Sequence, residues 1–69
     1  MTEFKLEGRE YIELSDLLKV TGLINSGGMA KMAITEGHVT VGGSPELRKR
    51  CKIRKGQIVG YQGRTIVVT

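Results

Sequence analysis

The spacing of hydrophobic side chains changes along the chain and predicts a different element in each part. Apolar and charged residues alternate over residues 3–12, which indicates a β-strand interrupted by a turn near residues 8–10. Leucines then recur at helical spacing over residues 13–22, and a second helical pattern covers residues 26–36. The connector between these two patterns is short, so we expect two short helices, antiparallel or crossed, in direct contact.

The second helical pattern has identifiable ends and an expected buried side. Either Asn25 or Ser26 can cap its first turn, because a short polar side chain there accepts a hydrogen bond from a free backbone N–H. A glycine follows each helical pattern, as is typical of helix C-termini. We expect Met29 and Met32 to fill gaps in the core, since methionine adapts to irregular packing. The other core residues of this helix are expected to be Ala30, Ala33 and Ile34.

Beyond residue 37 the pattern is that of β-structure. Residues 38–41 alternate between polar and apolar side chains, a glycine pair follows, and residues 44–46 are expected to continue the loop. Residues 57–61 and 64–69 form two further strand patterns around a Gln-Gly turn. The chain is therefore expected to combine two helices with several strands.

Positive charge is concentrated in one stretch, residues 48–55, which we call the basic segment. It holds six of the eleven Lys and Arg residues of the chain and no acid. Cys51 and Ile53 alternate with its cations, so a β-strand here would turn this apolar pair inward and the cations toward solvent. The six cations are Arg48, Lys49, Arg50, Lys52, Arg54 and Lys55. They suit a polyanion, because Lys and Arg gain affinity by displacing counterions from phosphates.

The two parts of the chain differ in their balance of charge. Residues 1–30 carry three basic and five acidic side chains, a balance of −2, whereas residues 31–69 carry eight and two, a balance of +6. Charge that served only to keep the domain in solution would be more evenly interspersed. The asymmetry therefore favours a polyanion-binding surface over a merely solvated one.

Length and composition limit the class of protein. A chain of 69 residues is long enough for one small core, and we expect residues 1–69 to form a single domain. No apolar run approaches the roughly 20 residues of a membrane-spanning helix, and residues 1–5 lack the pattern of a signal peptide. A small secreted domain would usually need several disulfides, whereas this chain has one cysteine. These features predict a cytoplasmic protein that does not contact a membrane.

Candidate catalytic groups are sparse. His38 is the only histidine and Cys51 the only cysteine, so neither a zinc site nor a supported Cys/His pair can be assembled. One Phe and two Tyr residues are too few for a platform of stacked bases. We therefore expect no enzymatic activity, no metal and no cofactor, and we expect any nucleic acid to be recognised by its backbone and shape.

Residues 22–43, with the sequence GLINSGGMAKMAITEGHVTVGG, resemble the core of the S4-type RNA-binding domain, which is named after a ribosomal small-subunit protein. The family pattern is a helix ending in Gly-Leu, a serine-rich connector, a second helix and then Gly-His-Val-x-Val. The last block is present with its spacing at residues 37–41. The resemblance covers about residues 13–59 and is strongest to short bacterial members that stand alone as single domains.

The resemblance implies both a fold and a set of RNA-binding residues. The implied fold is α+β, with two short packed helices (the alpha-L motif) against a small, mostly antiparallel sheet of about four to five strands. This agrees with the elements expected from the spacing of hydrophobic residues. Ser26 matches the connector serine of the family, Lys31 the arginine of the second helix, and His38 the histidine after glycine. Lys52 lies where the family often has an arginine before the last strands.

Three positions depart from the family pattern. Glu13 replaces a basic residue at the start of the first helix, Gly27 a basic residue in the connector, and Gly42 the asparagine of the Val-Asn-Gly turn. Each departure weakens the usual RNA-binding face, while the basic segment supplies more charge than the family pattern requires. We infer that the basic footprint has moved toward the loop and strand after residue 43.

The leading interpretation is a monomeric, non-catalytic module that recognises structured RNA through phosphates and 2′-hydroxyls. The resemblance implies ribosomal RNA or tRNA as the partner, and a ribosome or ribosome-assembly particle as the setting. The alternative from another class is a protein-interaction or regulatory module whose basic segment docks an acidic protein. DNA is a third partner that phosphate contacts alone do not distinguish, and an enzyme acting in trans is a fourth.

Overall fold

The computed structural model describes residues 1–69 and contains two helices and seven strands. In chain order these are β1 (Thr2–Phe4), β2 (Ile12–Glu13), α1 (Leu14–Val20), α2 (Gly27–Thr35), β3 (Val39–Val41), β4 (Ser44–Pro45), β5 (Lys52–Ile53), β6 (Ile58–Tyr61) and β7 (Arg64–Val68). The mixture of two helices and two sheets is the α+β fold expected from the sequence.

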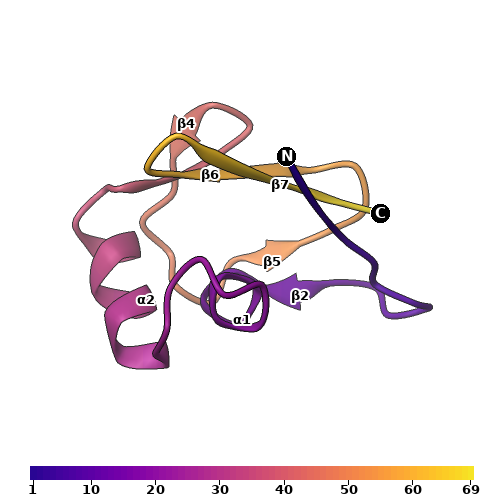
Figure 1. Cartoon of the computed structure of the whole chain (residues 1–69), viewed down its shortest axis with the longest axis horizontal. Coiled ribbons are helices and arrows are strands. Elements are labelled where there is room, and N and C mark those ends of the chain that lie inside the picture. The colour runs from indigo at the N-terminus through magenta and orange to yellow at the C-terminus, as the bar shows by residue number, and fades with distance from the viewer.

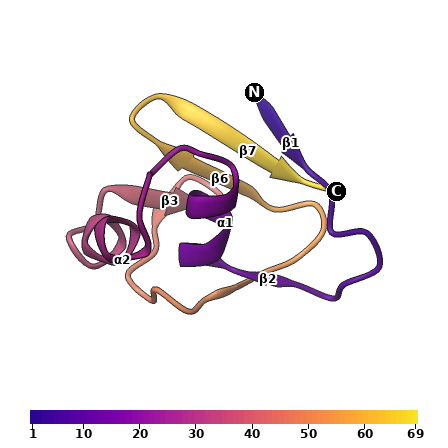
Figure 2. The ribbon, with the colours of Figure 1, turned by 60° about the horizontal axis from the view of Figure 1, so that its bottom comes forward.

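The strands form two sheets of unequal size. The larger has the order β1-β7-β6-β3-β4, in which β1 and β7 are parallel and the other neighbours are antiparallel. The smaller consists of β2 and β5, which are antiparallel. Figure 1 shows the larger sheet above the small sheet and the two helices. Figure 2 shows α1 and α2 packed side by side, with β1 along β7 at the edge of the larger sheet.

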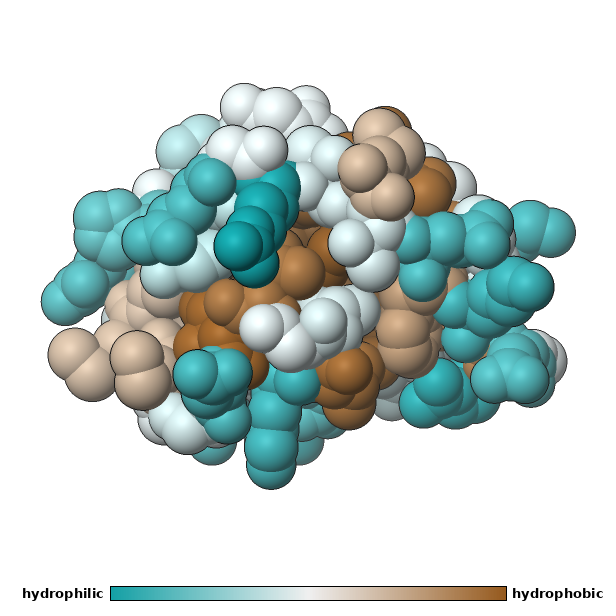
Figure 3. Space-filling model, in the orientation of Figure 1, coloured by the Kyte–Doolittle hydropathy of each residue, from teal (hydrophilic) through white to brown (hydrophobic).

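The core lies between these two layers and draws on nearly every element. It comprises fourteen buried hydrophobic residues, and α1 contributes Leu14, Leu17 and Leu18, all fully buried. Their spacing of three and four residues places them on one face of the helix. The larger sheet contributes its inward-facing valine and isoleucine side chains, including Val59 and Ile66. In Figure 3, hydrophobic atoms occupy the centre of the visible face and hydrophilic side chains surround them.

The expected helix boundaries are confirmed. Helix α2 begins after Ser26, whose hydroxyl oxygen accepts a hydrogen bond from the Met29 N–H at 3.1 Å. Gly22 and Gly37 follow the C-caps of the two helices with φ of 79° and 82°. Residues with a Cβ rarely adopt this left-handed conformation, so glycine at these two positions allows each helix to end where it does.

The expected burial of the two methionines on α2 is wrong. Met29 is 61% exposed and Met32 is 59% exposed, whereas Ala30, Ala33 and Ile34 are buried as expected. Successive residues of a helix are rotated by roughly 100°, so Met29 lies beside the buried face and Met32 lies nearly opposite it. The short helix buries only a narrow stripe of two alanines and one isoleucine, and both thioether side chains face solvent.

Two strand expectations also need correction. The strand expected over residues 3–12 is wrong in extent, because only Thr2–Phe4 and Ile12–Glu13 are strand, and these join the larger and the smaller sheet respectively. Residues 44–46 were expected to be loop, but Ser44–Pro45 forms β4 and pairs with β3. β4 is an edge strand, where a proline is tolerated because no further strand needs its missing N–H.

None of the helices has the length and apolar character needed to cross a membrane.

Candidate nucleic-acid interface

The basic segment is anchored to the core by one buried side chain. Ile53 is fully buried and lies opposite Ile12 in the pairing of β5 with β2, while Lys52 lies opposite Glu13 and is exposed. The expectation of a strand through the whole segment is therefore wrong in extent, because only Lys52–Ile53 is strand and residues 48–51 form a turn and its exit. Lys52 and Ile53 alternate outward and inward as expected, and Cys51 is half-buried against the core.

The turn that precedes β5 is held by the first turn of α1. The Leu14 N–H donates to the carbonyl of Cys51 at 2.9 Å, and the Ser15 N–H donates to the carbonyl of Lys49 at 3.1 Å. These N–H groups have no partner inside their own helix, and the N-cap residue Glu13 makes no side-chain cap. Backbone of the basic segment therefore takes the place of a capping side chain, and this fixes the course of residues 49–51.

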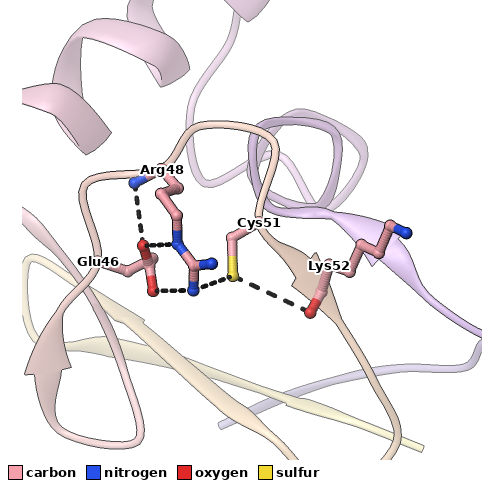
Figure 4. Close-up of polar contacts among 4 residues, drawn as sticks. All are labelled: Glu46, Arg48, Cys51 and Lys52. Atoms are coloured by element: carbon pink, nitrogen blue, oxygen red, sulfur yellow. Dashed lines mark hydrogen bonds and ion pairs between the residues drawn. The ribbon is translucent and has the colours of Figure 1, made fainter.

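Glu46 holds Arg48 in one orientation (Figure 4). Arg48 donates from Nε to Glu46 Oε2 at 2.9 Å and from Nη2 to Oε1 at 3.2 Å, and its backbone N–H donates to Oε2 at 3.0 Å. The hydrogen bonds from the Arg48 side chain, followed by that from its backbone, lower the pKa of Glu46 from 4.5 to about 2. The same pairing raises the pKa of Arg48, so both groups are charged at neutral pH.

Cys51 lies next to this pair but is not activated by it. Its Sγ is 3.6 Å from Nη2 of Arg48. Burial, reinforced by the negative charge of Glu46, raises the pKa of the Cys51 thiol above its ordinary value of 9.0. The thiol is therefore protonated at neutral pH, and it packs as a small hydrophobic side chain, as the sequence predicted.

The other cations of the segment meet residues from β2 and the loop before it. Arg50 Nη2 lies 3.4 Å from Glu13 Oε2, and Arg54 Nη1 lies 4.0 Å from Glu10 Oε2. Lys52 Nζ lies 5.0 Å from the centre of the Tyr11 ring, and the Arg54 guanidinium carbon lies 5.6 Å from it, which are cation–π distances. Tyr11 thus orders the outer face of the small sheet.

These acidic and aromatic partners of the basic segment were not expected from the sequence. In the sequence, Glu13 stood out only as the loss of a basic residue of the family pattern. The available signal was the two-residue period of an extended chain: Tyr11, just before β2, and Glu13, in β2, are two residues apart and so project to the same side. For Glu46 the signal was its position two residues before Arg48.

An open hollow is formed where the turn meets β5. It has a volume of about 380 Å³ and is lined by Arg48, Arg50, Cys51 and Lys52. Three of the four lining side chains are cationic, and two of them, Arg48 and Arg50, are paired with carboxylates. No group of three or more His, Cys, Asp or Glu side chains in the chain is placed to hold a metal ion.

The three family-matched residues outside the basic segment lie along α2. Ser26 caps the start of the helix, and Lys31 is exposed in its middle. His38 follows the end of the helix, with its side chain 63% exposed and its Nε2 3.5 Å from Glu36 Oε1. A helix of nine residues is about 14 Å long, so Ser26 and His38 lie at opposite ends of this surface.

The basic segment begins beside the C-terminal end of α2. The Glu46 N–H donates to the carbonyl of Val39 at 3.0 Å. A Cβ placed on Gly37 would lie 3.9 Å from Leu47 Cδ2. The residues on both sides of His38 therefore contact the loop that enters the basic segment, whereas Ser26 lies at the far end of the helix. The structure brings His38, but not Ser26, close to the start of the basic segment.

Comparison with known proteins identifies relatives over nearly the whole chain. The model of the S4 domain family matches residues 4–69. The YbcJ protein of Escherichia coli strain K12 is 48% identical over 68 residues, which cover 99% of this chain and 97% of YbcJ. The Bacillus subtilis strain 168 protein named "Probable ribosome maturation protein RlbA" is 39% identical over 54 residues, covering 78% of this chain and 76% of that protein.

A solved structure is similar to the whole fold. The solution structure of YbcJ from Escherichia coli superposes with a TM-score of 0.77 and covers 100% of this chain and 87% of that one. That structure is described as revealing an alpha-L motif involved in RNA-binding. The pair of packed helices and the sheet described above are thus shared with this relative.

Proposed function

The chain belongs to the S4 domain family, and from this we propose that it is a non-catalytic module that binds structured RNA through the basic segment. The observation that carries the proposal is the way this segment is held. Four of the six cations, at positions 48, 49, 50 and 52, lie on a turn and strand fixed by the buried side chain of Ile53 and by two hydrogen bonds from α1, and the other two follow directly after the strand. A cationic stretch on such a scaffold presents its charges in a constant arrangement.

Because the cations of the basic segment are held on a fixed backbone, we expect a structured RNA to bind better than a flexible one. Double-stranded RNA is recognised mainly by shape, through phosphates and 2′-hydroxyls, rather than by base sequence. A rigid cationic surface meets the regular phosphates of such a partner without ordering itself first, which lowers the entropic cost of binding. His38 and Lys31 would extend the contact along α2, and Ser26 would mark its far end.

The relatives suggest the class of RNA. YbcJ has a structure described as carrying a motif involved in RNA-binding, and RlbA carries a name that refers to ribosome maturation. We infer that this chain binds ribosomal RNA or tRNA, and that it acts as a monomer on a ribosome or an assembling ribosomal particle in the cytoplasm. An acidic protein partner is the alternative that the first experiment addresses.

The test is a titration of the protein with a structured ribosomal RNA fragment, a tRNA and a DNA duplex at several salt concentrations. We expect tighter binding to the two RNAs, with log K falling by about 0.7–0.9 per contacted phosphate for each log unit of salt. Lys52→Ala should weaken binding to both RNAs and reduce this slope by about one phosphate contact. Lys19→Ala, which removes an exposed lysine near the end of α1, is the matched control and should leave both quantities unchanged.

Equal and weak binding to all three nucleic acids would contradict the proposal. The same conclusion would follow if Lys52→Ala and Lys19→Ala reduced the affinity equally, because the charge would then act only through the net charge of the protein. A stable complex with an acidic protein that survives nuclease treatment would then favour the interaction-module alternative.

A further inference from the structure

The arginines and the lysines of the basic segment have different surroundings. Each arginine has a carboxylate oxygen within 4.0 Å, and each carboxylate comes from outside the segment. The pairs are Arg48–Glu46 at 2.9 Å, Arg50–Glu13 at 3.4 Å and Arg54–Glu10 at 4.0 Å. Lys49, Lys52 and Lys55 have no carboxylate at such a distance. The six cations therefore divide into three that are paired and three that are not.

Lys52 shows that lying next to a glutamate in the sheet is not enough to form an ion pair. It lies opposite Glu13 in the pairing of β5 with β2, where an ion pair would be expected. Glu13 instead meets Arg50, and the Lys52 ammonium lies over the Tyr11 ring. The aromatic ring positions the ammonium but does not neutralise it, so this lysine keeps its full charge toward solvent.

The three pairs contribute only a small part of the stability of the fold. The side chains of Arg48, Arg50 and Arg54 are 77%, 78% and 55% exposed, and ion pairs at such exposure contribute little to folding. What the pairs do change is the availability of each guanidinium. Arg48 has its Nε and Nη2 directed at Glu46, so a phosphate reaching that edge must displace a carboxylate already bound there.

We propose that Lys49, Lys52 and Lys55 make the phosphate contacts of the basic segment, while Glu46, Glu13 and Glu10 withhold the three arginines from phosphate. This inference rests on the proposed RNA-binding function. Each phosphate that an unpaired lysine neutralises releases cations condensed on the RNA, and this release drives association. The carboxylates then limit the attraction for any polyanion, and they leave the paired arginines as fixed groups that set the shape of the surface.

The test measures the salt dependence of binding to a short RNA duplex, which presents phosphates without a specific sequence. Lys49→Ala should reduce the slope of log K against log salt by about 0.9, the value for one phosphate contact on a duplex. Arg48→Ala should change the slope by much less, because that charge is already compensated by Glu46. Glu46→Gln should increase the slope by about 0.9 and tighten binding, because it releases Arg48.

A double variant separates the release of Arg48 from a general change in charge. Arg48→Ala in the Glu46→Gln background should now reduce the slope as much as Lys49→Ala does. Glu3→Gln is the matched control, since it removes an exposed carboxylate on β1 that meets no arginine, and it should change the slope much less than Glu46→Gln. Glu46→Gln keeps every residue of the basic segment, so its result does not depend on whether Arg48→Ala disturbs the turn.

Several results would overturn the inference. Equal reductions in slope for Arg48→Ala and Lys49→Ala would show that paired and unpaired cations contact phosphate alike. Equal effects of Glu46→Gln and Glu3→Gln would show that only net charge matters. Either result, with wild-type binding intact, leaves the proposed function standing, whereas absence of salt-dependent binding by the wild-type protein would remove both.

Discussion

The basic segment and the exposed surface of α2 were both expected to contact RNA, but the structure attaches them to the protein in different ways. The basic segment is fixed by a buried isoleucine, by strand pairing with β2 and by hydrogen bonds from α1. On α2, by contrast, Lys31 and the two methionines project from a helix that buries only a narrow stripe. The difference indicates that one surface depends on the core for its shape, while the other depends on a single helix.

The largest expected effect is on stability, and it tests whether the basic segment is attached to the core more firmly than the exposed surface of α2 is. Ile53→Ala should lower the free energy of unfolding by about 2–5 kcal/mol, because it leaves a cavity where a fully buried side chain was. Met32→Ala on α2 should change it by no more than about 0.5 kcal/mol, since that side chain faces solvent. Urea denaturation followed by circular dichroism measures both values. Similar losses for the two variants would show that the basic segment is not anchored as described.

A smaller effect concerns the start of α2. Ser26→Ala should cost about 1 kcal/mol of stability, because the Met29 N–H loses its capping acceptor. Ser26→Asp should retain the cap, since aspartate is also a good N-cap residue, while it places a negative charge on the proposed RNA surface. We therefore expect Ser26→Asp to unfold like wild type and to bind RNA more weakly. Undiminished RNA affinity in Ser26→Asp would remove Ser26 from the interface and leave it a purely structural residue.

The smallest effect is a dependence of stability on pH that arises from the pairing of Glu46 with Arg48 of the basic segment, and not from α2. The pKa of Glu46 is lowered in the folded protein from 4.5 to about 2, so its pairing with Arg48 stabilises the fold above pH 4.5. This contribution is lost as the pH falls through about 2, where the folded protein also takes up the proton. Thermal unfolding of Glu46→Gln should therefore start at a lower temperature than wild type at pH 7, and the two proteins should converge near pH 2. A difference that stays constant between these pH values would contradict the pairing.

Elements that depend on neighbouring residues could be predicted from the sequence. The ends of α2 follow from Ser26 and from the glycine at position 37, whose roles are local. The helical leucines and the alternation at residues 52 and 53 likewise indicated which side chains are buried. The motif at residues 37–41 pointed to the family, and the matching family model confirms it.

Features that depend on distant segments could not be predicted in the same way. The parallel pairing of β1 with β7 joins opposite ends of the chain, and a strand pattern does not name its partner. The exposure of Met32 follows from how narrow the buried stripe of α2 is, which only the packing against α1 decides. For the candidate site, the cations could be found from their clustering, but the carboxylates that pair with Arg50 and Arg54 come from β2 and from the loop before it.

The missing side-chain cap of α1 has a consequence for how the RNA-binding surface comes into being. The first N–H groups of this helix are satisfied by carbonyls more than thirty residues later in the chain, from Lys49 and Cys51. The start of α1 and the basic turn therefore support each other in the folded chain. A synthetic peptide of residues 48–55 would reproduce the charge without this geometry, so the arrangement of the cations is a property of the folded chain and cannot be transplanted with the segment alone.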